Sequence, residues 1–239
     1  MEVKEKKQSL RKIPATVITG FLGSGKTSLI QHLISTANGL QLAFIINEFG
    51  DLGVDKELLL GCGLEDCDEG DIVELANGCI CCTLREDLLI EVTKLAKERS
   101  FDYLLIESTG ISEPLPVAET FTFADEDGVS LSDVAKLDTM VTVVDAVNFL
   151  KDYDEAKFLQ EVGESLGEDD QRSVADLLVD QVEFADILLI SKTDLVTEPD
   201  INKLKAILRT LNTHARIIPI SNGEITTDDI LSTDLFDFD

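Results

Sequence analysis

The chain has 239 residues, of which 44% are hydrophobic, and its 47 acidic and 20 basic side chains give a formal net charge of -27 at pH 7. This length and composition allow one large globular domain or two small ones. The negative charge repels nucleic acid and anionic lipid, so we expect neither as a partner. An acidic surface attracts cations, although it also serves solubility alone.

The N-terminal stretch 1–12 is charged and lacks the apolar segment of a signal peptide. No run reaches the ~18 apolar residues of a membrane span. We therefore expect a cytoplasmic protein with a charged tail over 1–12 and one folded domain over 13–239. In a reducing compartment its five cysteines are expected to be metal ligands or buried thiols rather than disulfides.

Short apolar runs alternate with helical stretches along the chain. The expected strands are 15–19, 42–46, 103–107, 140–145, 187–191 and 216–220. The expected helices are 26–37, 84–99, 116–123, 173–184 and 199–211. This alternation predicts an α/β fold with a doubly wound, mostly parallel sheet and helices on both faces. The acidic stretches 125–138 and 152–170 interrupt the alternation, and we expect them to be solvated insertions.

A glycine-rich segment, GFLGSGKT at 20–27, matches the complete GxxxxGK[ST] phosphate loop. An apolar run precedes it and helical spacing follows it, which is the strand, loop and helix order of a P-loop NTPase. In such loops the backbone N–H groups surround the phosphates, the lysine contacts the β and γ phosphates, and the threonine hydroxyl ligates Mg²⁺. The expected nucleotide-binding residues are Gly20, Gly23, Ser24, Gly25, Lys26, Thr27 and Ser28. The alternative is an ordinary glycine-rich turn between a strand and a helix.

The segment SKTD at 191–194 follows another apolar run and resembles the NKxD element of GTPases. Asp194 can accept hydrogen bonds from guanine N1–H and the N2 amino group, and Lys192 can lie along the base, so GTP is favoured over ATP. Ser191 stands where asparagine is usual. The missing amide predicts weaker affinity or relaxed selectivity. The alternative is a helix N-cap with an aspartate in its first turn.

The segment ESTG at 107–110 also ends an apolar run, and it resembles a Walker B carboxylate followed by a switch glycine. We expect Glu107 to hold the Mg²⁺ shell and the Gly110 N–H to sense the γ-phosphate. With Lys26, these are the expected catalytic residues. Intrinsic hydrolysis should be slow, because no arginine finger can be identified from the sequence. A carboxylate that caps the next helix is the alternative.

A compact cysteine cluster, GCICC at 78–82, holds Cys79, Cys81 and Cys82. A turn is needed to direct three thiolates at one centre, and soft sulfur ligands suit Zn²⁺ or Co²⁺ in a tetrahedral site. Cys62 and Cys67 lie upstream, in the irregular stretch 48–78 that is rich in Gly, Asp and Cys. They can supply a fourth ligand or a delivery site, or they can be buried thiols.

These motifs occur in the order seen in CobW-type GTPases of the CobW/HypB/UreG class, which the chain resembles over nearly its whole length from residue 13. The shared segments are GFLGSGKTS, NEFGD at 47–51, GCICC, ESTGISEP and SKTD. The resemblance implies a Mg·GTP-dependent metallochaperone whose cysteine cluster binds zinc or cobalt and releases it to a client metalloenzyme on hydrolysis. It also implies that Glu48 and Asp51 lie in a switch segment near Mg²⁺.

The resemblance leaves several points open. The N-terminal third looks most like the cobalt-associated CobW branch, whereas the chain from CTLREDL onward looks like the zinc-associated, YciC-like branch. Family members commonly continue into a C-terminal domain, which we expect to be absent from this chain, and dimerisation across the nucleotide face is common in the class. The alternative function is a regulatory GTPase with a structural zinc site whose output is partner binding.

Overall fold

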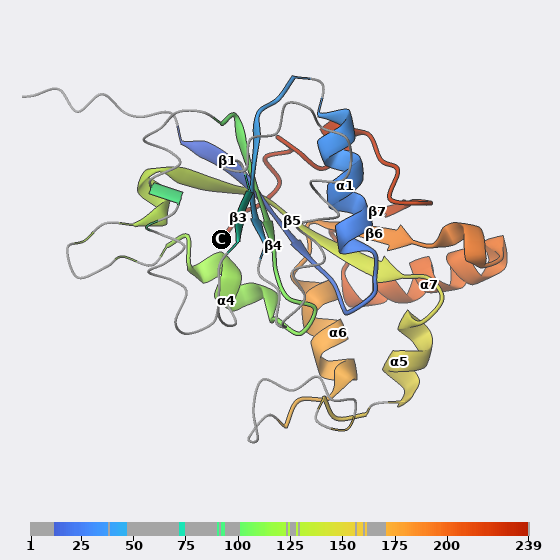
Figure 1. The fold of residues 1–239 in the computed structure, drawn as a ribbon. Helices are drawn as coiled ribbons and strands as arrows, with labels where there is room; N and C mark the ends of the chain where they lie inside the picture. Colours follow the sequence, from blue (N-terminus) through green and yellow to red (C-terminus); the bar gives the residue numbers. More distant parts are fainter. Residues whose placement is uncertain are drawn as a thin grey trace, which may run out of the picture.

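The structure is a computed structural model, and it describes residues 12–37, 39–46, 72–74, 90, 92–93, 101–122, 124, 128, 130–155, 157–159, 161 and 171–238. Within these residues seven strands, all pairing in parallel, form one sheet in the order β3-β2-β4-β1-β5-β6-β7. The predicted doubly wound fold is confirmed (Figure 1). No helix in this part of the chain is both long and apolar enough to cross a membrane.

The strands are β1 (Ile13–Thr19), β2 (Leu42–Ile46), β3 (Ile72–Glu74), β4 (Tyr103–Glu107), β5 (Ala135–Asp145), β6 (Ile187–Ser191) and β7 (Arg216–Pro219). The helices are α1 (Lys26–Thr36), α4 (Pro114–Glu119), α5 (Phe149–Glu155), α6 (Val174–Glu183) and α7 (Glu198–Leu211). Short 3-10 turns are η1 (Leu131–Asp133), η2 (Thr193–Leu195) and η3 (Thr227–Asp229).

Helices cover both faces of the sheet (Figure 1). Successive strand residues point to opposite faces, and neighbouring residues of β1 show this. Ile18 joins the core cluster of Leu33 in α1, whereas Val17 joins the cluster of Val117 in α4 on the other face. A third cluster joins α5, α6 and α7 to β6. Both faces of the central strands are therefore buried, as continuously apolar runs predict.

The strand register gathers polar residues at one edge of the sheet. Ile18 pairs with Glu107, and Asp145 pairs with Ser191. Because all the strands run in the same direction, the carboxyl ends of β4, β1, β5 and β6 meet at this edge. Open parallel sheets bind their ligands at this edge.

The structure corrects several predicted elements. β5 begins at Ala135, so the end of the stretch 125–138 is a buried strand rather than a solvated insertion. α5 extends into the stretch 152–170, because Phe149 packs in the α6 cluster. α4 starts earlier than the predicted helix 116–123, because Pro114 suits the first turn of a helix, and it ends at Glu119. β3 was not predicted. Most of the helix predicted over 84–99 lies outside the described residues.

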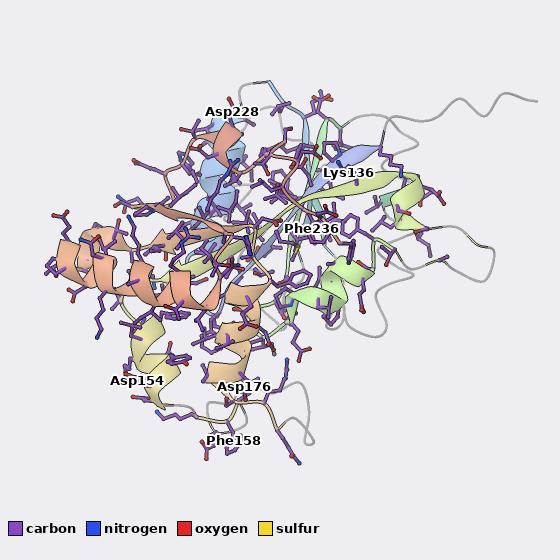
Figure 2. All side chains as sticks on the ribbon, turned by 180° about the vertical axis from the view of Figure 1, so that it is seen from behind. Lys136, Asp154, Phe158, Asp176, Asp228 and Phe236 are labelled. Atoms are coloured by element: carbon purple, nitrogen blue, oxygen red, sulfur yellow. The ribbon has the colours of Figure 1, made fainter. Side chains whose placement is uncertain are left out.

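The residues after β7 hold the opposite side of the sheet, where the strands begin. Asp138 of β5 is buried and accepts hydrogen bonds from the Tyr103 hydroxyl at 2.8 Å and from the Thr233 N–H at 2.9 Å. The Asp138 carbonyl accepts from the Phe236 N–H at 3.0 Å. Figure 2 shows Phe236 over the middle of the molecule, where its ring lies 6.2 Å from that of Phe184. These contacts fasten the C-terminal segment 230–238 to the sheet.

Candidate functional site

The phosphate loop follows β1 and leads into α1. Its backbone needs glycine, because Gly20, Gly23 and Gly25 have φ values of 135°, 68° and 104°, a range that residues with a Cβ rarely adopt. A Cβ on Gly20 would also lie 2.4 Å from the Val143 carbonyl oxygen. The loop therefore has the backbone path that lets N–H groups face a phosphate at a helix N-terminus.

Lys26 lies at the centre of this loop. Its Nζ donates hydrogen bonds to the Gly20 carbonyl at 2.9 Å and the Phe21 carbonyl at 3.3 Å. The side chain is 8% exposed, so the ammonium group is folded across the loop rather than extended into solvent. The expected contact of Lys26 with the phosphates stays a prediction. Thr27 and Ser28 follow in the first turn of α1.

Glu107 is the last residue of β4 and lies beside the phosphate loop. It is buried and pairs with Ile18, and the next residue, Ser108, donates its N–H to the Ile18 carbonyl at 3.0 Å. The carboxylate of Glu107 and the hydroxyl of Thr27 thus come from neighbouring elements at one edge. Oxygen ligands of these two kinds fit Mg²⁺.

Gly110 packs directly on the phosphate loop. A Cβ on Gly110 would lie 2.8 Å from the Leu22 backbone nitrogen and 2.7 Å from its Cδ2. Only glycine permits this approach without a shift. The expected switch glycine therefore contacts the loop at which we expect the γ-phosphate to bind.

Ser191 braces the phosphate loop from the other side. Its hydroxyl donates to the Ser24 carbonyl at 2.6 Å and also lies 3.2 Å from the Val144 carbonyl. The predicted weaker affinity or relaxed selectivity stays a prediction, but Ser191 keeps a contact with the phosphate loop at the position where asparagine is usual. The short side chain suffices because the end of β6 lies close to the loop.

Lys192 forms an ion pair at the end of the site where we expect the guanine base. Its φ is 56°, and its Nζ lies 2.7 Å from Asp145 Oδ2. Burial raises the pKa of the Asp145 carboxyl, but hydrogen bonds from Lys192, Asn148 and the Val147 N–H outweigh this and bring the pKa below its usual value. Asp145 therefore stays ionised and fixes the Lys192 stem along the site.

Asp194 lies in η2 and is exposed, so its carboxylate is open to a base. The turn is fixed by Thr193, whose hydroxyl donates to the Ile220 carbonyl at 2.8 Å and lies 2.8 Å from the Ser221 hydroxyl. The segment after β7 also contacts α1, because a Cβ on Gly223 would lie 2.8 Å from the Ser28 carbonyl. This segment closes the site on a side that the sequence prediction left out.

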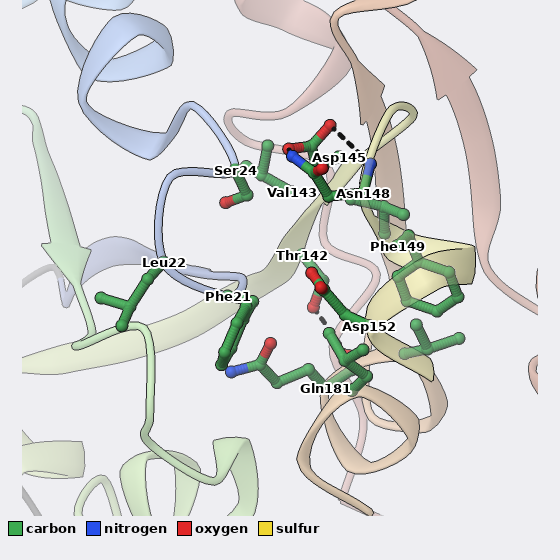
Figure 3. A pocket seen from close by; sticks show the side chains of 13 residues that line it. Phe21, Leu22, Ser24, Thr142, Val143, Asp145, Asn148, Phe149, Asp152 and Gln181 are labelled. Atoms are coloured by element: carbon green, nitrogen blue, oxygen red, sulfur yellow. Dashed lines mark hydrogen bonds between the residues drawn. The ribbon is translucent and has the colours of Figure 1, made fainter. Parts of the chain in front are cut away.

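A cavity of about 40 Å³ lies between the phosphate loop, the end of β5 and helices α5 and α6 (Figure 3). Its polar lining includes Ser24, Asp145, Asp152 and Gln181. Burial raises the pKa of the Asp152 carboxyl. Neither Asp145 nor Gln181 was among the site residues predicted from the sequence. The sequence pattern could have identified both residues, because Asp145 ends an apolar run as Glu107 does, and Gln181 is a polar residue on the apolar face of a helix.

Seven predicted residues lie outside the described part of the chain. They are Glu48, Asp51, Cys62, Cys67, Cys79, Cys81 and Cys82. All five cysteines are therefore among them. The described residues contain no group of three or more His, Cys, Asp or Glu side chains that could hold a metal ion. The proposed metal ligands and switch carboxylates stay predictions.

A glycine-rich loop between a buried strand and a helix, with a carboxylate on the adjacent strand, defines a P-loop nucleotide-binding protein. Residues 14–219 match the model of the CobW/HypB/UreG nucleotide-binding domain. The chain belongs to this family, and the resemblance drawn from its motifs is confirmed.

Several relatives match the chain over most of its length. It is 44% identical to the zinc-regulated GTPase metalloprotein activator 1 of Dictyostelium discoideum, over 98% of this chain and 51% of the relative. It is 40% identical to the zinc chaperone CobW of Sinorhizobium sp, over 90% of this chain and 60% of the relative. The chain thus spans about half to three fifths of these relatives.

A solved structure agrees with the fold. The hydrogenase maturation factor HypB of Archaeoglobus fulgidus superposes with a TM-score of 0.53 at 19% identity, over 87% of this chain and 81% of HypB. At this identity the similarity concerns the fold alone.

Proposed function

We propose that this chain is the GTPase domain of a zinc metallochaperone, which binds Mg·GTP, hydrolyses it and passes a metal ion to a client metalloenzyme. The observation that carries the proposal is the single edge of the sheet where the phosphate loop, Glu107 and the Lys192–Asp194 turn meet. Relatives at 44% and 40% identity are named as a zinc-regulated GTPase and a zinc chaperone.

Each residue of the site has a role in this reaction. Lys26 neutralises charge on the β and γ phosphates, and Asp194 reads guanine while Lys192 lies along the base. Thr27 and Glu107 would hold Mg²⁺, which would stabilise the charge that develops on the phosphates. Gly110, against the loop at Leu22, would detect the γ-phosphate through its N–H. The chain's own groups therefore bind and orient the nucleotide.

The cargo metal would bind at Cys79, Cys81 and Cys82. Thiolates suit both Zn²⁺ and Co²⁺, and the names of the relatives favour zinc as the cargo. Cys62 and Cys67 are candidates for a fourth ligand. The three cysteines follow the 48–51 segment in sequence, so inward movement of that segment in the GTP state would gather the thiolates, and hydrolysis would loosen them.

The coupling that this switch needs is small. A tenfold difference in metal affinity between the GTP and GDP states corresponds to about 1.4 kcal/mol. Linkage requires that the metal tighten GTP binding by the same factor.

A second copy of the chain is a candidate partner at the nucleotide edge. Leu22, Val147 and Leu195 are 41%, 45% and 67% exposed, and each follows the carboxyl end of a neighbouring strand. Sedimentation with GDP and with a non-hydrolysable GTP analogue would detect such a dimer.

Competitive chelator titrations of Zn²⁺ and Co²⁺ test the proposed function. They would be run with Mg·GDP and with a non-hydrolysable Mg·GTP analogue, on the wild type and on a variant with Cys79, Cys81 and Cys82 replaced by serine. We expect tighter metal binding in the GTP state, and loss of that binding in the variant. A second variant, with Cys62 and Cys67 replaced by serine, tests whether these residues supply the fourth ligand. Equal affinity in both nucleotide states would instead indicate a structural zinc site in a regulatory GTPase.

A further inference from the structure

Gln181 of α6 holds the segment that carries the switch glycine. Its side-chain amide is buried, with the residue 1% exposed, and Nε2 donates hydrogen bonds to the Gly110 carbonyl at 3.1 Å and the Ser112 carbonyl at 3.2 Å. These two carbonyls flank Ile111. One amide group therefore fixes the backbone on both sides of that residue, immediately after the glycine that packs on the phosphate loop.

The backbone of Gln181 is also connected to the strand that leads into the phosphate loop. Its carbonyl accepts a hydrogen bond from the Thr142 hydroxyl at 2.7 Å, and that hydroxyl lies 2.7 Å from the hydroxyl of Thr19. Thr19 is the last residue of β1, directly before Gly20. Buried polar groups thus connect Thr19, where the phosphate loop begins, to α6 and, through the Gln181 side chain, to residues 110–112.

The cavity beside the loop is lined by residues of the phosphate loop and by Gln181. Two of its lining atoms, Ser24 Oγ and Gln181 Oε1, are buried and have no hydrogen-bond partner among the described residues. Leaving a buried polar atom unpaired costs about 1–3 kcal/mol. The cavity is large enough for water, and Figure 3 shows both side chains lining it. Ordered water there would pair with both atoms.

We infer that Gln181 is a positioning residue for the nucleotide switch, which sets the orientation of Gly110 and transmits its movement to α6. When the γ-phosphate draws the Gly110 N–H inward, the Gln181 amide must follow the carbonyls that it holds. A water molecule bound in the cavity would hydrogen-bond to the other end of that amide. This inference rests on the proposed GTP-dependent switch.

Nucleotide titrations of two Gln181 variants test this role. The measured quantity is the ratio of the Kd for GDP to the Kd for a non-hydrolysable GTP analogue. Gln181→Leu removes both amide groups at similar volume, and we expect GDP affinity within about twofold of wild type while the ratio falls about tenfold. Gln181→Glu has no N–H to donate when ionised but can donate an O–H when protonated. Relative to the wild-type ratio at the same pH, its ratio should therefore recover as the pH falls from about 8 to about 5.5, because burial raises a carboxyl pKa. Asp145 and Asp152 line the same cavity, and the wild-type measurement at each pH accounts for their titration.

Asn212→Leu is the matched control. Asn212 is also a buried amide beside α6, and its Nδ2 donates to the Val182 carbonyl at 2.9 Å and the Ala185 carbonyl at 2.8 Å. None of its side-chain hydrogen bonds goes to residues 110–112. We expect this variant to lose stability and to keep the wild-type ratio of Kd values.

Different outcomes would overturn different claims. A wild-type ratio of one would remove the proposed switch itself and the inference with it. A wild-type ratio well above one that Gln181→Leu leaves unchanged would overturn the inference alone. A fall in the ratio for Asn212→Leu equal to that for Gln181→Leu would assign the effect to general destabilisation. If Gln181→Leu does not fold, Gln181→Glu at the two pH values makes the same comparison.

Discussion

Gly110 and Leu22 are in such close contact that a methyl group on Gly110 would lie 2.8 Å from the Leu22 backbone nitrogen. The two residues come from different elements, one after β4 and one within the phosphate loop. Their contact is the most direct structural connection between the expected switch and the phosphate-binding backbone.

Gly110→Ala should therefore disturb both stability and nucleotide response. The added methyl group must push against backbone, so we expect a loss of about 1–3 kcal/mol in the free energy of unfolding, measured by urea denaturation. The affinity for a non-hydrolysable GTP analogue should fall more than the affinity for GDP. In the double variant with Leu22→Ala part of the lost stability should return, because the Leu22 side chain makes two of the three closest contacts. Additive losses would contradict the steric explanation.

Asp145→Asn tests the ion pair with Lys192. The pKa of Asp145 lies below its usual value, so its stabilising contribution is complete above the unfolded pKa of about 4 and is lost as the pH falls through the folded pKa. We expect the variant to be less stable by about 1–3 kcal/mol at pH 7, and the deficit to shrink in acid. Asp152→Asn is the control, because the pKa of Asp152 is raised and the same substitution there should not destabilise at pH 7. A deficit that does not depend on pH would exclude the ion pair as its cause.

Asp186→Asn should have the opposite effect on stability. Burial raises the pKa of the Asp186 carboxyl to about 6. A raised folded pKa gives stability that is fully present below about pH 4 and is lost as the pH rises through about 6. The neutral variant should therefore be more stable than wild type by about 1–2 kcal/mol at pH 8, with little difference at pH 4. Denaturation at several pH values measures this, and a variant no more stable than wild type at pH 8 would contradict the prediction.

Tyr103→Phe should loosen the segment after β7. The Tyr103 hydroxyl accepts a hydrogen bond from the Ser232 N–H at 3.0 Å and donates one to Asp138 at 2.8 Å. Its removal should cost about 1–3 kcal/mol and speed hydrogen exchange at the Ser232 amide. In Tyr153→Phe, which keeps the ring that stacks on Phe149, exchange at that amide should stay as in wild type. Unchanged exchange in Tyr103→Phe would show that other contacts hold the segment.

The sequence predicted the central strands because their signal is local. The bounds of β2, β4 and β6 are the predicted ones, since each run is apolar and ends at a polar residue or a turn. The same pattern predicted that Glu107 and the 191–194 segment lie at the carboxyl ends of strands. Local pattern was enough for the elements that make the site.

Long-range contacts explain what the sequence did not show. The start of β5 carries Lys136 and Asp138, which resemble a polar loop. Asp138 is buried only because partners far along the chain, including Tyr103 and Thr233, satisfy its oxygens. The Lys192–Asp145 pair likewise depends on the register of β5 against β6. A single sequence contains no direct record of such pairings.

Ser191 holds the phosphate loop at Ser24, and Gly110 contacts it at Leu22. The loop is therefore held on one side by the strand that leads to the expected guanine-binding turn and on the other side by the expected switch glycine. If a nucleotide with the wrong base shifts the end of β6, the Ser191 hydrogen bond carries the shift to the groups around the phosphates. Base selectivity should then be expressed in kcat as well as in KM, because the reacting phosphate would be misplaced even when the site is saturated.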